Sequence, residues 1–144
     1  MTGSGEANGT NWLLTIQLSA EAAAVRLVRK LLANAARIEG ASELEAHQIE
    51  VAVGEALAQG VSFRDHDGAD SVTVSAKLRA GRFIVSFAWN HVPARSIAVR
   101  DGRGHERVLG WGLHVIAQVV DEVEIREPFK RGQMPRLRLV KRIG

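Results

Sequence analysis

The chain has 144 residues, of which 46% are hydrophobic, and its 19 Lys and Arg against 16 Asp and Glu give a net charge of +3. This length favours one domain with one core and excludes two ordinary domains. The chain contains no cysteine, which excludes disulfides, thiolate metal sites and a catalytic cysteine, and fits a cytoplasmic location. The basic residues are spread along the sequence and no apolar run is long enough to cross a bilayer, so we expect neither direct nucleic-acid binding nor membrane insertion.

The N-terminal part of the chain predicts a tail, a strand and a helix. Residues 1–10 are small, polar and rich in glycine, so we expect a disordered tail followed by a single domain at residues 11–144. Apolar residues alternate with polar ones over residues 11–18, which is typical of a strand. Ser19 then offers a side-chain oxygen that could cap a helix over residues 20–38.

Two helices follow each other in this first half. The face of the first helix that we expect to be buried is formed by residues four positions apart, namely Ala23, Leu27, Leu31 and Ala35. Gly40 ends that helix, and Ser42 with Glu45 has the spacing of a capping box. A second helix is therefore predicted over residues 43–61. Its predicted sheet-facing residues are Ile49, Val53, Ala56, Leu57 and Gly60.

The second half predicts mainly strands. Two alternating segments, 71–78 and 82–89, flank the dipeptide Ala80-Gly81 and are typical of a hairpin. Residues 92–109 contain one proline, two glycines and many charges, so we expect a mobile loop there. The remaining chain predicts a helix over 112–120, a strand over 123–127 and a closing strand over 135–143.

This order of elements indicates the fold class. Strands joined by hairpins, with helices inserted singly or as a pair, predict an α/β protein of the α+β type, a two-layer sandwich. We expect a mixed, mostly antiparallel sheet with the helices on one face. A doubly wound parallel sheet is not expected.

The element order and three local motifs resemble the GHKL ATPase family, especially its anti-sigma-factor serine kinase branch. The resemblance covers residues 12–143 and implies a Bergerat-type fold with ATP and magnesium as cofactors. In that branch the second helix carries a glutamate that acts as general base and, four residues later, an asparagine that ligates magnesium. Glu55 matches the base and Gln59 replaces the asparagine. Gln59 has one extra methylene, which is expected to weaken the octahedral magnesium site.

The second motif of the family is D-x-G-x-G, in which the aspartate accepts a hydrogen bond from the adenine amino group. Here Trp89 stands at the aspartate position, and His91 and Pro93 stand at two glycine positions. An indole cannot accept that hydrogen bond, and it is large enough to fill an adenine pocket. Alternatively, Asn90 supplies the polar contact if a bulge shifts the strand by one residue.

The third motif is a G-x-G-L step that brings helix amides to the phosphates. Gly110, Gly112 and Leu113 preserve it before the helix predicted over 112–120. By itself, such a step often means only a tight turn into a helix.

Two functional hypotheses follow, and a third stays open. The first is a regulatory protein resembling an anti-sigma factor, which binds a sigma factor or an anti-anti-sigma domain with weak or absent ATP binding. The second is an active ATP-dependent serine-protein kinase that phosphorylates an anti-anti-sigma domain. The third is a structural module of a larger signalling ATPase. The resemblance also implies a homodimer and partner docking around the first helix and the nucleotide lid, where the basic residues are Arg26, Arg29, Lys30, Arg37, Arg95, Arg100, Arg103 and Arg107.

Overall fold

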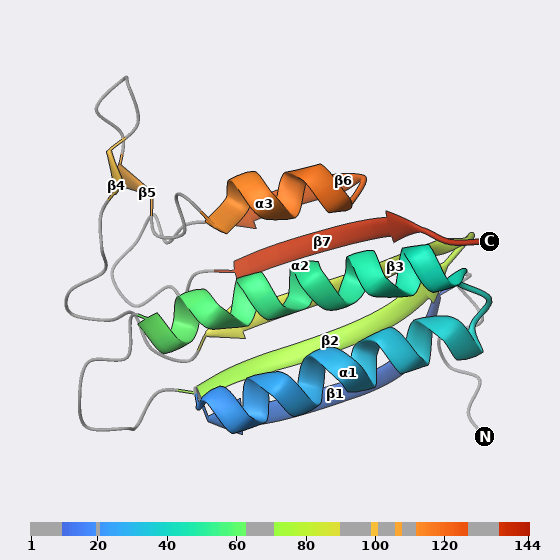
Figure 1. Cartoon of the computed structure of the whole chain (residues 1–144), viewed down its shortest axis with the longest axis horizontal. Helices are drawn as coiled ribbons and strands as arrows, with labels where there is room; N and C mark the ends of the chain where they lie inside the picture. The colour runs from blue at the N-terminus through green and yellow to red at the C-terminus, as the bar shows by residue number, and fades with distance from the viewer. Residues whose placement is uncertain are drawn as a thin grey trace.

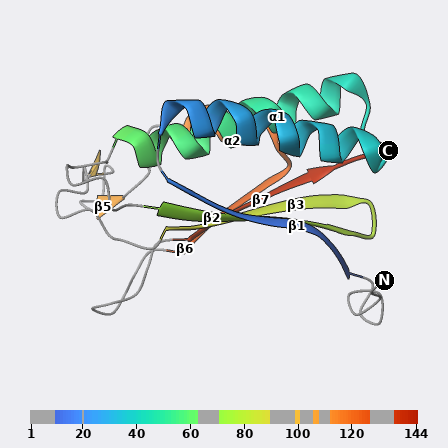
Figure 2. The same cartoon turned by 90° about the horizontal axis from the view of Figure 1, so that it is seen from below.

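The computed structural model describes residues 10–19, 21–62, 71–89, 99–100, 106–107, 112–126 and 136–144. They form two layers, a five-stranded sheet and three helices that cover one of its faces (Figures 1 and 2). The helices are α1 (Ala22–Ile38), α2 (Glu43–Ser62) and α3 (Gly112–Val119). The sheet consists of β1 (Thr10–Ser19), β2 (Ser71–Arg79), β3 (Arg82–Trp89), β7 (Arg136–Arg142) and β6 (Glu122–Arg126), in this spatial order.

The predicted α+β fold class is confirmed. Every strand pair in the described five-stranded sheet is antiparallel, so the sheet is more regular than the mixed one that we expected. All three described helices lie on the same side of the sheet, and none of the described helices covers the other side (Figure 2). None of the helices in the described part of the chain is long and apolar enough to cross a membrane.

The β2–β3 hairpin forms at the predicted dipeptide. Arg79 pairs with Arg82, which leaves Ala80 and Gly81 as a two-residue loop. Both loop residues have positive φ angles, 50° for Ala80 and 76° for Gly81. Positive φ at both central positions gives the turn a twist that matches the twist of the two strands.

The capping box at the start of α2 is confirmed. The Glu45 amide donates to Ser42 Oγ at 3.1 Å, and the Ser42 amide donates to Glu45 Oε1 at 2.8 Å. The predicted Ser19 cap is wrong, because Ser19 still belongs to β1 and α1 follows Glu21 without any side-chain cap. β1 also begins at Thr10, one residue inside the predicted tail.

The core lies between the helices and the sheet. As predicted, α2 buries Ile49, Val53, Ala56 and Leu57, each at most 2% exposed. The alternating segments also contribute to the core, with Val74 of β2 and Phe83 and Phe87 of β3 almost fully buried. These side chains form one continuous apolar cluster under the helices.

The predicted buried face of α1 is wrong. Leu27 is 70% exposed and Leu31 is 44% exposed, whereas the buried residues of α1 are Val28, Leu32, Ala33 and Ala36. α1 carries apolar residues on two adjacent stripes. The buried one belongs to the wider apolar face, because Ala24, Val25 and Ala35 beside it also pack against the core.

The segment predicted to be a loop contains a short ladder. β4 (Val99–Arg100) pairs antiparallel with β5 (Glu106–Arg107). The other residues of the segment 92–109 lie outside the described part of the chain.

Candidate functional site

α2 supplies the first two candidate residues. Glu55 and Gln59 both lie within α2 and are one helical turn apart, so they share a helix face. The Glu55 side chain is half-buried. Its carboxylate makes no hydrogen bond or ion pair with another described residue, so it is free to interact with a ligand.

Trp89 is the last residue of β3 and belongs to the core. It is only 8% exposed, and its ring stacks on Phe87 with a centroid distance of 6.0 Å and an interplanar angle of 23°. Both residues point toward the helix layer because they are two positions apart on one strand. The indole therefore occupies space between the sheet and the helices.

The third motif is placed at the start of α3. Gly112 is the first residue of α3 and Leu113 the second. The first amides of a helix have no intrahelical partner, so this end can donate hydrogen bonds to an anion. Gly110 and Asn90 lie outside the described residues, so their predicted roles remain predictions.

These candidate positions converge at one end of the molecule. The C-terminal end of α2, the C-terminal end of β3 and the N-terminal end of α3 all lie at the left of Figure 1. α2 and α3 are also in direct contact. The fold thus brings Glu55, Gln59, Trp89 and Gly112 to the same end of the molecule, although they come from distant parts of the sequence.

The basic residues of α1 do not form one cluster. Arg29 packs between the helices, where a Cβ atom on Gly54 would lie 3.3 Å from its Cδ, and its Nε lies 3.9 Å from Glu50. Arg37 pairs with Glu43, with Nε 3.0 Å from Oε2. Of the four predicted basic residues of this helix, the exposed ones without such a contact are Arg26 and Lys30.

Two surface features were missed at the sequence level. Ile38 and Leu44 are 79% and 65% exposed, near the connection between α1 and α2, and they extend the exposed leucines of α1. The open face of the sheet also holds a groove, which contains none of the predicted site residues. The alternation of arginine and leucine at the start of β7 could have predicted arginines on that face, because leucines in the core place the arginines between them on the opposite face.

The comparisons with known proteins agree with this architecture. The model of the histidine kinase-like ATPase domain matches residues 18–141, and the chain belongs to this family. A similar solved structure is that of the RsbU and RsbW domains of Rv1364c from Mycobacterium tuberculosis, at 19% identity and a TM-score of 0.65. The match covers 91% of this chain and 33% of that chain. No curated protein sequence matches.

Proposed function

We propose that this protein is a regulatory binding protein resembling an anti-sigma factor, which engages a sigma factor or an anti-anti-sigma domain and binds ATP weakly or not at all. The observation that carries this proposal is the burial of Trp89 in the core. In this proposal the chain keeps the fold of an ATPase domain but has little or no ATPase activity.

The nucleotide argument rests on what Trp89 replaces. The family resemblance implies an aspartate here, whose carboxylate would accept a hydrogen bond from adenine, whereas an indole only donates. The Trp89 ring is packed against Phe87, so making room for adenine would require moving a buried aromatic side chain. Burial of such a side chain is worth about 1.5–3 kcal/mol, which an incoming nucleotide would have to offset.

The magnesium argument concerns Gln59. Its extra methylene displaces the amide oxygen from the position that an asparagine would give it, and Mg²⁺ demands near-ideal octahedral geometry. Weakened metal binding and a missing adenine acceptor act together against phosphoryl transfer, because both Mg²⁺ and precise positioning are needed for that reaction.

The partner argument rests on the exposed face of α1. Leu27, Leu31 and Ile38 recur at helical spacing on this face, and Leu44 of α2 lies beyond its C-terminal end. We call these four residues the apolar stripe. Large apolar side chains exposed together along one helix are typical of a protein interaction surface. Arg26 and Lys30 are exposed on α1 on one side of the stripe, so a partner with acidic side chains would match it.

The alternative is an active serine-protein kinase, and one observation favours it. The Glu55 carboxylate is half-buried without a partner among the described residues, as an available general base would be. In this alternative, Glu55 accepts the proton of the attacking serine, Gln59 holds magnesium and the start of α3 binds the phosphates.

Calorimetric titration of the full chain with ATP and Mg²⁺ distinguishes the two functions. The regulatory proposal predicts no binding at micromolar ATP, and micromolar binding would overturn it. The double variant Trp89→Asp/Gln59→Asn is expected to bind ATP more tightly than the wild type. Circular dichroism establishes whether this variant folds. If it does not, the Gln59→Asn single variant tests the magnesium site alone, because it leaves Trp89 in place.

A further inference from the structure

The two layers of the molecule carry opposite net charges. Along each strand, the residues that alternate with the core residues point away from the helices, onto the open face of the sheet. Among the side chains that the structure describes, this face carries six basic and two acidic ones, a net charge of +4, namely Lys77, Arg79, Arg82, Arg136, Arg138, Arg142, Glu122 and Glu124. Residues 21–62, which contain α1 and α2, carry six acidic and four basic side chains, a net charge of −2. Between these two layers, the basic excess thus lies on the open face.

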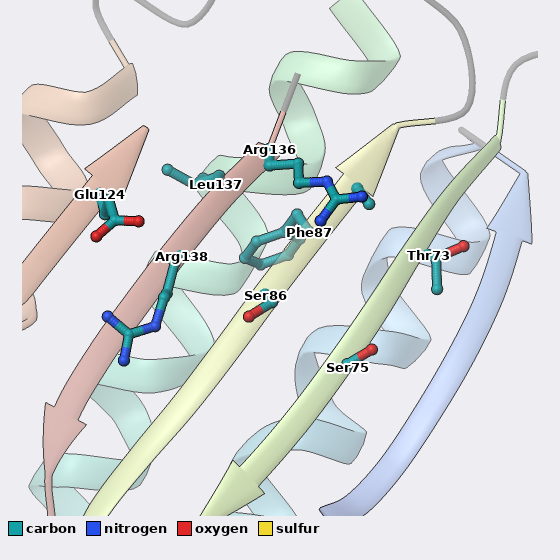
Figure 3. Close-up of a pocket in the computed structure, with 9 residues that line it drawn as sticks. Thr73, Ser75, Ser86, Phe87, Glu124, Arg136, Leu137 and Arg138 are labelled. Atoms are coloured by element: carbon teal, nitrogen blue, oxygen red, sulfur yellow. The ribbon is translucent and has the colours of Figure 1, made fainter. Parts of the chain in front are cut away.

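The cations are spread over this face and do not converge on one point. The pairing register places Arg79, Arg82 and Arg142 in one row across β2, β3 and β7. Arg138 and Arg136 lie further along β7, beside a groove of about 350 Å³, where Arg136 reaches across β3 and Arg138 extends on the side of β6 (Figure 3). Strand spacing and rise make the face about 20 Å wide and about 20 Å long. The charges therefore cover an area, and no small ligand could contact all of them.

Most of these arginines have no counter-charge. Arg82 is paired, with its Nη2 atom 2.5 Å from Oε2 of Glu122. The arginines of the open face that form no side-chain ion pair or hydrogen bond with another described residue are Arg79, Arg136, Arg138 and Arg142. Three of these four side chains are exposed, and that of Arg138 is half-buried. Their charges are thus available to an external anion.

The apolar residues of this face are covered. Ile84 lies opposite Val140 in the register, and they are only 1% and 0% exposed. The ion pair of Arg82 and Glu122 joins β3 to β6 and so crosses β7, which lies between them, beside Val140. The large apolar side chains that are exposed in the described part of the chain all lie on α1 and α2. The open face therefore offers charge, and no described apolar group that could insert into a partner.

We propose that the open face of the sheet binds an anionic membrane surface through electrostatic attraction alone. Such a surface is a plane of many mobile headgroups, so each arginine can pair with a different one even though the side chains point in different directions. Arginine forms two parallel hydrogen bonds with phosphate, and each basic residue close to an anionic leaflet adds to the attraction. Glu122 and Glu124 both lie on β6, at one edge of the sheet, so their repulsion is confined to that edge.

The layout favours a membrane over other polyanions. Single-stranded nucleic acid is bound along a groove with aromatic rings for stacking, and readers of the duplex place a helix or a ribbon in the major groove. The described side chains of the open face include no aromatic ring, and no described helix lies on this side. An acidic protein would need fixed carboxylates that match cations pointing in several directions. The helix layer faces the other way, so Glu55 and the apolar stripe stay accessible on a membrane-bound molecule (Figure 2).

Vesicle co-sedimentation of the full chain tests the proposal. The vesicles contain either equimolar phosphatidylserine and phosphatidylcholine or phosphatidylcholine alone. At low salt we expect binding to the first kind with an apparent Kd of about 1 mM lipid, and none to the second. Binding should disappear at about 0.5 M salt, because screening shortens the range of the attraction. Equal binding to both kinds of vesicle, binding that persists at high salt, or tighter binding to a duplex oligonucleotide or polyglutamate at equal charge concentration would overturn the proposal.

Variants with two substitutions locate the surface. Arg79→Gln/Arg142→Gln and Arg136→Gln/Arg138→Gln should each weaken vesicle binding at least tenfold, since each cation near an anionic surface accounts for about fivefold. The melting temperature should not fall, because these side chains form no ion pair with a described residue. The matched control is Arg26→Gln/Lys30→Gln, which removes two exposed charges from the helix layer. Equal weakening by the control would mean that net charge alone attracts the protein, and would overturn the assigned face.

Discussion

The Oε1 atom of Glu45, at the start of α2, accepts a hydrogen bond of 3.2 Å from the backbone amide of Gly144, which follows β7. The same oxygen accepts from the Ser42 amide in the capping box. One carboxylate thus caps a helix and ties the end of the last strand to it.

These contacts make stability depend on the charge of Glu45. The hydrogen bond from the Ser42 amide and then that from the Gly144 amide hold the pKa of Glu45 below its ordinary value of 4.5. A carboxylate whose pKa is lower in the folded state stabilises the fold at neutral pH, and this contribution is lost as the pH falls through the folded-state pKa. Glu45→Gln should therefore lower the free energy of unfolding at neutral pH, and the difference should shrink in acid. Urea unfolding over this pH range measures it, with Glu39→Gln as control, and a difference independent of pH would contradict the explanation.

Replacement of Trp89 tests how much the indole contributes to the core. Trp89→Ala should lower the free energy of unfolding by about 3–5 kcal/mol, because a buried aromatic side chain is removed and a cavity remains. Trp89→Phe should cost less because it keeps an aromatic ring beside Phe87. Urea unfolding followed by circular dichroism gives both values. A loss below about 1 kcal/mol for the alanine variant would show that the indole does not support the core.

The two faces of α1 can be told apart by paired substitutions. Leu32→Ala should lower the free energy of unfolding by about 2–5 kcal/mol, because Leu32 is fully buried. Leu27→Ala should change it by no more than about 0.5 kcal/mol, because Leu27 is 70% exposed. Both variants make the same chemical change on the same helix, so each is the control for the other. A larger loss of stability for Leu27→Ala than for Leu32→Ala would mean that the face predicted from the sequence is the buried one.

Reversing the free basic residues of α1 tests partner docking. The double variant Arg26→Glu/Lys30→Glu should associate more slowly with candidate sigma-factor and anti-anti-sigma domains, with a nearly unchanged off-rate, because charges at a rim act mainly on diffusional encounter. The effect should fade at high salt. Surface plasmon resonance gives both rates. Arg37→Glu is less informative because Arg37 pairs with Glu43. Association indifferent to both salt and charge reversal would eliminate docking at this face.

Gly54 offers a test of helix propensity against packing. A Cβ atom at this position would lie 3.3 Å from Arg29 Cδ, which is a close contact. The Arg29 side chain is 41% exposed, so it can move away from the added methyl group. Alanine favours a helix interior over glycine by about 1 kcal/mol, so Gly54→Ala should raise the free energy of unfolding by up to that amount. Thermal and urea unfolding measure the change. A destabilised variant would mean that Arg29 is held firmly between the helices.

The sequence by itself determined the elements and most of the fold. Alternation at residues such as Val72 and Phe83 predicted the strands, the Ser42 and Glu45 spacing predicted the start of α2, and Ala80-Gly81 predicted the hairpin. These signals are local, because capping and turn formation involve residues only a few positions apart. The shared helix face of Glu55 and Gln59 could also be predicted, because it depends only on their four-residue spacing.

Only the tertiary structure decided which of two apolar stripes of α1 is buried. Leu27 and Leu31 fit a helical period as well as Val28 and Leu32 do. The choice depended on how α1 is oriented against the sheet and α2, which buries the wider apolar face that includes Ala24 and Val25. The tertiary structure also decided the positions of Arg136 and Arg138. Their place near Ser86 depends on the pairing of β3 with β7, two strands from distant parts of the sequence. A register between strands is a long-range property, set when one face of each strand is buried, and for that reason the groove could not be read from composition.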